Sequence, residues 1–191
     1  IAIFFYCFAW GVAQDESGEE QTWIDFKTRQ AIERGLTFLV SQQNDHTGDD
    51  HGSFGDQKYA IAVTSFACLA LLADGNVPDR GRYGTNVANG LDFILRCVSE
   101  SGYITRNGDE SRMHGHGYAM LFLAEVYGMS SQNPGDAKKI RDKLLRAIAM
   151  SKNSQTSDGG WGYDPTSTEH EGSVTVVQVQ ALRACRNAGL I

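Results

Sequence analysis

The sequence contains no long hydrophobic run and no stretch of basic residues. Residues 1–12 are apolar and uncharged, but a helix that crosses a bilayer needs about 20 such residues. The 17 Lys and Arg residues are outnumbered by 23 Asp and Glu residues, and no basic run is long enough to follow a phosphate backbone. We therefore expect no stable membrane span in the mature chain and no nucleic-acid partner.

Proline is also scarce, with 3 residues against 21 glycines. The glycines gather in loops between apolar segments, where they mark turns. Of the 191 residues, 41% are hydrophobic and 21% are charged. This composition argues against a disordered tail, a collagen-like fibre and a protein with several membrane spans, and the length suits one globular domain.

The N-terminal segment has the pattern of an export signal. Its apolar run has the length of a signal-peptide core, and Gly11, Val12 and Ala13 supply the small residues that a signal peptidase recognises. No Met and no basic segment precede Ile1. We expect a signal peptide at residues 1–13, truncated at its N-terminus, then a polar linker at 14–27, and a periplasmic, extracellular or cell-surface location.

The cysteines show no pattern of a metal or redox site. Cleavage after Ala13 would leave Cys68, Cys97 and Cys185, an odd number, and no CxxC pair occurs. Each of the three lies in an apolar helical pattern. We expect small buried side chains rather than disulfides or nucleophiles.

The body of the chain predicts a repeated helical hairpin. Apolar residues recur at helical spacing around 32–40, 87–98 and 140–151. Each segment precedes a glycine-bearing loop and a second, more uniformly apolar segment, at 59–73, 116–127 and 173–188. Ile32, Val87 and Leu144 are 55 and 57 residues apart. Val174 to Val179 alternates like a strand, but its place in the repeat favours a helix, so we predict an all-α fold of three hairpins.

The loops within the hairpins carry a second repeated signal. An aromatic residue follows glycine in each, as Phe54, Tyr103 and Trp161. A glycine at such a position lets the ring fold back onto the preceding helix end. These rings are predicted to fasten the loops.

Around these loops the sequence resembles the QW motif of squalene and hopene cyclases. The third repeat matches it through Arg146, Ala147, Met150, Gln155, Gly159 and Trp161, and the first through Arg34, Gly35, Gln43, Gly52 and Phe54. The second keeps Gly102 and Tyr103 without the glutamine. The resemblance is to the prenyltransferase and squalene-oxidase repeat, and it covers residues 29–189.

This resemblance implies a fold and roles for several residues. Members of the family arrange helical hairpins as an (α/α) toroid with outer and inner helices, of which residues 28–191 would supply three hairpins, a partial ring. Gln43, Phe54, Tyr103, Gln155, Gly159 and Trp161 would be structural fasteners.

The enzymatic motifs of the family do not occur in these residues. There is no DxDD proton donor, no zinc set of Asp, Cys and His, and no Gly-Cys-Gly-Glu-Gln thioester motif. We therefore assign no catalytic residue, metal or cofactor, and expect a module that binds a hydrophobic ligand or a protein partner. The alternative is a terpenoid cyclase or prenyltransferase-type enzyme whose catalytic repeats lie outside this stretch.

Candidate ligand-binding residues cluster at the inner segments and loops. His114 and His116 begin an inner segment, His51 and His170 occupy comparable loop positions, and Tyr118 follows on the inner segment. The other candidates for lining a cavity are Tyr59, Phe66, Met120 and Phe122. Histidines at a helix start also commonly bond a loop carbonyl, and aromatic residues at helical spacing commonly form core, so both alternatives stay open.

Overall fold

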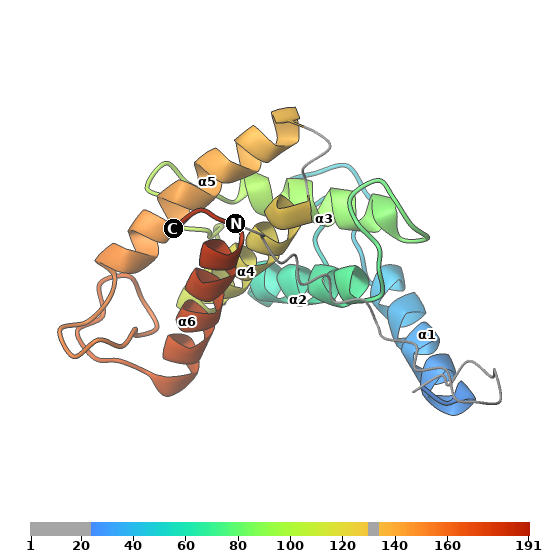
Figure 1. Ribbon diagram of the computed structural model, residues 1–191, viewed down its shortest axis with the longest axis horizontal. Helices are drawn as coiled ribbons and strands as arrows, with labels where there is room; N and C mark the ends of the chain where they lie inside the picture. The colour runs from blue at the N-terminus through green and yellow to red at the C-terminus, as the bar shows by residue number, and fades with distance from the viewer. Residues whose placement is uncertain (1–23, 130–133) are drawn as a thin grey trace, which may run out of the picture. The chain divides into compact units, whose positions relative to one another are not determined.

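A computed structural model describes residues 24–129 and 134–191 of the chain, and every described segment of regular structure is helical. The elements are α1 (Phe26–Ser41), the 3-10 turn η1 (Gln57–Tyr59), α2 (Ala60–Ala73), α3 (Gly84–Arg96), α4 (Arg112–Met129), α5 (Pro134–Asn153) and α6 (Gly172–Asn187) (Figure 1). The all-α prediction is confirmed, and Val174–Val179 lies within α6 as a helix. No helix in the described ranges is long and apolar enough to cross a membrane.

The expected signal peptide and most of the expected linker lie outside the described residues. The described structure begins with α1, which starts at Phe26 inside that expected linker. Asp25 caps the helix, because its Oδ1 accepts a 2.7 Å hydrogen bond from the Thr28 N–H. Among the described residues, those up to Thr37 and those from Phe38 onward form two separate units, and the packing described below belongs to the second.

Three central helices form a row in the second unit. Helix α4 packs between α2 and α6, and these three helices are called the inner row below. Helix α3 packs on α2, and α5 packs on α4 (Figure 1). Helices α2 and α4 are apolar around most of their circumference, as a helix with neighbours on several sides requires; Leu71 and Phe122 are among their fully buried residues.

The loops that precede the inner helices share one backbone pattern. The N–H groups of Asn44, Ser99 and Thr156 donate to the carbonyls of Ser53, Tyr103 and Gly160, at 2.8, 3.0 and 2.9 Å. The glycine just before each of these carbonyl residues has a positive φ, 86° at Gly52, 89° at Gly102 and 92° at Gly159. The three loops are therefore structural repeats of one another.

Each loop is also fastened to the inner helix that follows it. The N–H of Phe54 donates to Thr64 Oγ1 at 2.9 Å, and the N–H of Trp161 donates to Thr175 Oγ1 at 3.0 Å. In the second repeat the donor is the N–H of Ile104, and the acceptor is His116 Nδ1 at 3.2 Å. In the second repeat, Ile104 therefore takes the position of Phe54 and Trp161, which was predicted for Tyr103. The sequence pattern matches Tyr103 with Phe54 and Trp161 because all three are aromatic. In the structure Tyr103 is equivalent to Ser53 and Gly160, so that match is wrong by one residue.

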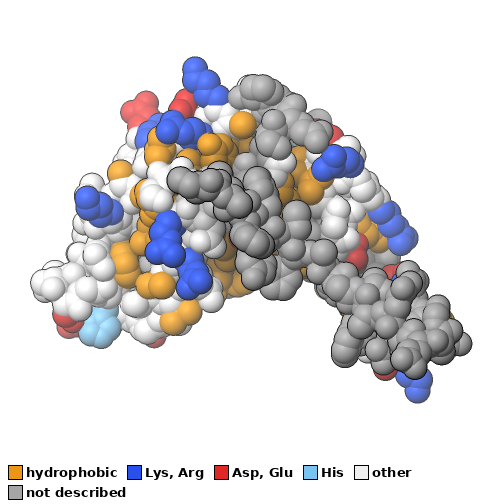
Figure 2. Space-filling model, viewed as in Figure 1, with side chains coloured by type: hydrophobic (Ala, Val, Ile, Leu, Met, Phe, Trp, Pro, Cys, Tyr) orange, Lys and Arg blue, Asp and Glu red, His pale blue; other side chains and the backbone are white. Residues whose placement is uncertain are grey.

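Exposure is uneven along the inner row. Helices α2 and α4 are covered by α3 and α5, whereas α6 is the last helix of the described chain. Hydrophobic side chains reach the surface over α6 in Figure 2, and Val176 and Val179 are 56% and 52% exposed.

Candidate functional site

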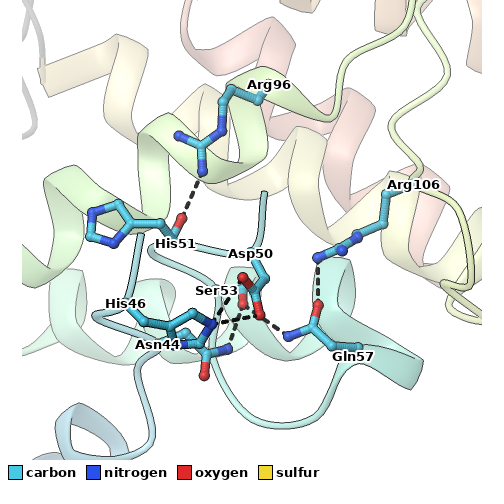
Figure 3. A network of polar contacts seen from close by, with 8 residues as sticks. All are labelled: Asn44, His46, Asp50, His51, Ser53, Gln57, Arg96 and Arg106. Carbon is cyan, nitrogen blue, oxygen red and sulfur yellow. Dashed lines mark hydrogen bonds and ion pairs between the residues drawn. The ribbon is translucent and has the colours of Figure 1, made fainter. Parts of the chain in front are cut away.

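The first loop carries a network of polar side chains. His46 Nε2 lies 3.1 Å from Asp50 Oδ1, and Asn44 Nδ2 donates to Ser53 Oγ at 2.8 Å (Figure 3). At the end of α3, Arg96 Nη2 donates to the carbonyl oxygen of His51 at 2.7 Å. The network holds the loop that contains Asp49 and Asp50 against the second repeat.

A second arginine reaches the same region from the second loop. Arg106 Nη1 donates to Gln57 Oε1, and Gln57 in turn lies within hydrogen-bond distance of Ser53 (Figure 3). Both guanidinium groups lie beside the Phe93 ring, with Cζ at 5.9 Å for Arg96 and 5.6 Å for Arg106. Each arginine therefore links the second repeat to the first through a hydrogen bond.

A cavity of about 290 Å³ lies beside this network. Its lining residues are Asp49, Arg96, Cys97, Thr105, Arg106 and Asn107. Burial raises the pKa of Cys97 to about 11, although the nearby Arg106 and Arg96 oppose that shift. The thiol is protonated at neutral pH, so Cys97 is not a thiolate nucleophile.

The histidine at the start of α4 makes a contact that resembles a catalytic pair. His114 Nε2 lies 2.8 Å from Ser173 Oγ, and Ser173 Oγ donates to Glu171 Oε2. Since the hydroxyl proton points at Glu171, His114 is the donor to Ser173 and cannot remove its proton. Hydrogen bonds from Ser173 and from the Val174 N–H hold the pKa of Glu171 below its usual range. The arrangement caps α6 rather than activating a serine.

His116 is fully buried and serves the fold. Its Nδ1 accepts the Ile104 N–H, which requires an unprotonated Nδ1. Burial lowers the pKa of His116 from 6.5 to about 4. The ring is neutral at physiological pH, and the Tyr103 ring packs 5.6 Å from it between ring centroids.

The remaining predicted histidines lie in separate loops. His170 Nδ1 bonds Asp158 Oδ2 at 2.8 Å in the third loop, and His51 lies in the first. Within residues 24–129 and 134–191, no group of three His, Cys, Asp or Glu side chains is placed to hold a metal ion. The structure therefore does not gather His51, His114, His116 and His170 into one site.

Three of the predicted fastening residues, Gln43, Gln155 and Trp161, donate to backbone carbonyls. Gln43 Nε2 donates to the Gly52 carbonyl at 3.0 Å, and Gln155 Nε2 donates to the Gly159 carbonyl at 2.7 Å. Trp161 is buried, and its indole Nε1 donates to the Ser151 carbonyl at 2.7 Å.

An aromatic face on the inner row is the clearest candidate for binding. Tyr59, Val63 and Phe66 follow one another at helical spacing along η1 and α2, and all three are exposed. The Tyr118 ring of α4 lies 3.9 Å from the Phe66 ring, centroid to centroid. These four residues are called the aromatic face below. By contrast Met120 and Phe122, which were also expected to line a cavity, are completely buried in the core.

Several residues of these sites were missed by sequence reasoning. Arg96 and Arg106 contact acceptors 45 and 49 residues away in the chain, and no local motif marks such pairs. Thr64 and Thr175 could have been found, because each is a hydroxyl-bearing residue near the start of an inner helix, in α2 and in α6. Comparison of the chain with models of protein families, with curated proteins and with solved structures gives no match.

Proposed function

We propose that the chain is a binding module built from helical repeats of the prenyltransferase and squalene-cyclase type, and that its aromatic face takes an apolar ligand. The observation that carries this proposal is the pairing of the Phe66 and Tyr118 rings on the open surface of two inner helices. Export, as expected from residues 1–13, belongs to the same proposal.

The exposure of this face supports binding. Phe66 is 48% exposed, and Val63 and Tyr59 adjoin it along the same helical face. Soluble proteins rarely leave adjoining large apolar side chains in water unless a ligand or partner covers them. Tyr118 offers a phenol group at the edge, which could fix the polar end of a bound molecule.

The contacts of four of the five histidines support binding rather than catalysis. His46 pairs with Asp50, His114 with Ser173, and His170 with Asp158. A general base needs a free lone pair aimed at its substrate. These contacts instead hold loops and helix ends, as the Ile104 bond to His116 does.

A fluorescent apolar probe tests the proposal. We expect N-phenyl-1-naphthylamine to bind the protein and farnesol to displace it. Phe66→Ser should weaken farnesol binding about tenfold, equal to ~1.4 kcal/mol. Tyr163→Ser is the matched control, because Tyr163 is also 48% exposed but lies in the third loop.

Equal weakening in both variants would contradict the aromatic face as the site. Conversion of farnesol or farnesyl diphosphate by the purified chain would replace the binding proposal with the enzyme alternative. Mass spectrometry of the recovered ligand distinguishes binding from turnover.

A further inference from the structure

Each of the first two loops packs against the first helix of the following repeat, which is α3 for the first loop and α5 for the second. The first helices of the three repeats, α1, α3 and α5, are called the outer helices below. A Cβ on Gly52 would overlap the Asn89 carbonyl of α3, and a Cβ on Gly102 would overlap the Arg146 carbonyl of α5. In the first contact, Gln43 Nε2 also donates to the Asn86 carbonyl at 2.9 Å, and Asn86 Nδ2 donates to Gln43 Oε1 at 2.7 Å. The chain thus makes one type of contact twice.

The same contact needs a small residue on the outer helix. A Cβ on Gly90 of α3 would overlap Cys68 Sγ of α2. Ala147 stands one residue after Arg146 in α5, as Gly90 stands one residue after Asn89 in α3. An outer helix therefore brings a glycine or alanine against the preceding inner helix.

The third loop presents the same surface, but no described residue packs against it at Gly159. Gly159 has the φ of Gly52 and Gly102, yet no atom of the described residues lies within 4 Å of a Cβ placed there. Gln155 makes the bond within its own loop and is otherwise exposed.

On α6 the exposed residues stand at positions that are buried in the other inner helices. Alignment through Thr64, His116 and Thr175 places Val179 with Cys68 and Met120, which have no exposed surface. Val179 is half-exposed instead.

Helix α1 has the complementary surface. Its Arg34 and Gly35 occupy the positions of Asn89 and Gly90, and no atom of the described residues lies within 4 Å of a Cβ placed on Gly35. Ile32 is 42% exposed, whereas its counterparts in α3 and α5, Val87 and Leu144, are fully buried.

We propose that these two surfaces are the halves of one interface, and that α1 of a second copy docks on the third loop and α6 of the first. The Arg34 carbonyl then meets Gly159, Gly35 meets Val179, and the Gln155 amide reaches the Ala31 carbonyl. The interface joins two different surfaces, so it leads to head-to-tail assembly of copies. The proposal stands apart from the aromatic face and does not depend on a ligand.

Sedimentation equilibrium of the full chain gives the first test. The average mass should rise with concentration above the 20.9 kDa of one chain. Gly35→Leu should weaken association at least tenfold, because the leucine side chain would fill the space that Val179 of the other copy occupies. Val179→Asp should do so by placing a charge in the interface. Met129→Asp, an exposed apolar residue at the end of α4, is the control and should associate normally.

Mixing the two variants gives the decisive test. Each variant alone keeps only one working surface and should self-associate at least tenfold more weakly than the wild type. An equimolar mixture should form, at wild-type strength, a 1:1 dimer that does not grow further. Circular dichroism checks folding, and leucine is a better helix former than glycine, so Gly35→Leu should not unfold α1. A wild-type chain that stays monomeric at all concentrations, or a mixture without dimer, overturns the proposal.

Discussion

The buried imidazole of His116 predicts a loss of stability in mild acid. In the folded chain its Nδ1 accepts the Ile104 N–H, and burial lowers its pKa from 6.5 to about 4. Protonation would both place a charge in the core and remove the acceptor of that bond. The folded state therefore favours the neutral ring.

The sign and size of the effect follow from proton linkage. Above pH 6.5 the His116 ring is neutral in both the folded and the unfolded chain, and its contribution to the free energy of unfolding is complete. This contribution is lost as the pH falls from 6.5 to about 4, because the unfolded chain then binds a proton that the folded chain does not. At ~1.4 kcal/mol per pH unit, the loss amounts to about 3 kcal/mol. A loss of that size is a large fraction of the stability of a typical domain.

Urea denaturation at pH 7.5, 6, 5 and 4, followed by circular dichroism, measures this loss. Carboxylates such as Glu171 also contribute in acid, so the useful quantity is the difference from a variant without the imidazole. His116→Thr supplies the residue type that accepts the same bond at Thr64 and Thr175. It is expected to be less stable at pH 7.5, because threonine leaves a cavity, but to lose less stability between pH 6.5 and 4. Parallel pH profiles for the two proteins would refute the reasoning.

Two further substitutions test how the repeats are joined. Gly102→Ala should destabilise the fold by about 2 kcal/mol more than Gly108→Ala in urea denaturation, since both glycines have positive φ but only Gly102 abuts the Arg146 carbonyl; equal losses would contradict a role for the close approach. Gln43→Ala should cost about 2 kcal/mol, because it removes bonds to Gly52 and Asn86. Gln155→Ala should cost clearly less in the same assay, and a loss as large as that of Gln43→Ala would contradict the inter-repeat bond.

The helices were predictable because their signals are local. Apolar spacing located each helix, and the repeat register overruled the strand-like alternation of Val174 to Val179. The position of Ile104 was not predictable, because Tyr103 supplies a stronger local signal one residue earlier. Only the hydrogen bond from the Ile104 N–H to His116, between residues in different elements, identifies the buried position.

The polar contacts were less predictable than the helices, because they join residues in different elements of the fold. His114 and His116 were singled out together by their spacing, yet the structure separates their environments completely. His114 bonds Ser173 near the surface, whereas His116 has no exposed surface. A two-residue step on a helix turns the side chain by about 200°, so neighbours in sequence face different surroundings.

The three loops also show which part of a repeat must stay constant. Their backbone bonds and the positive φ of Gly52, Gly102 and Gly159 recur, while the acceptor that fixes each loop to its inner helix is a hydroxyl in two repeats and an imidazole in the middle one. Any buried side chain that presents a lone pair at that point satisfies the donor. Of the three acceptors only the imidazole of His116 titrates between pH 4 and 7. The bond between loop and inner helix is therefore insensitive to mild acid in the first and third repeats. It is sensitive in the second repeat, where α4 packs against both other inner helices. Acid should thus loosen the inner row first at its centre.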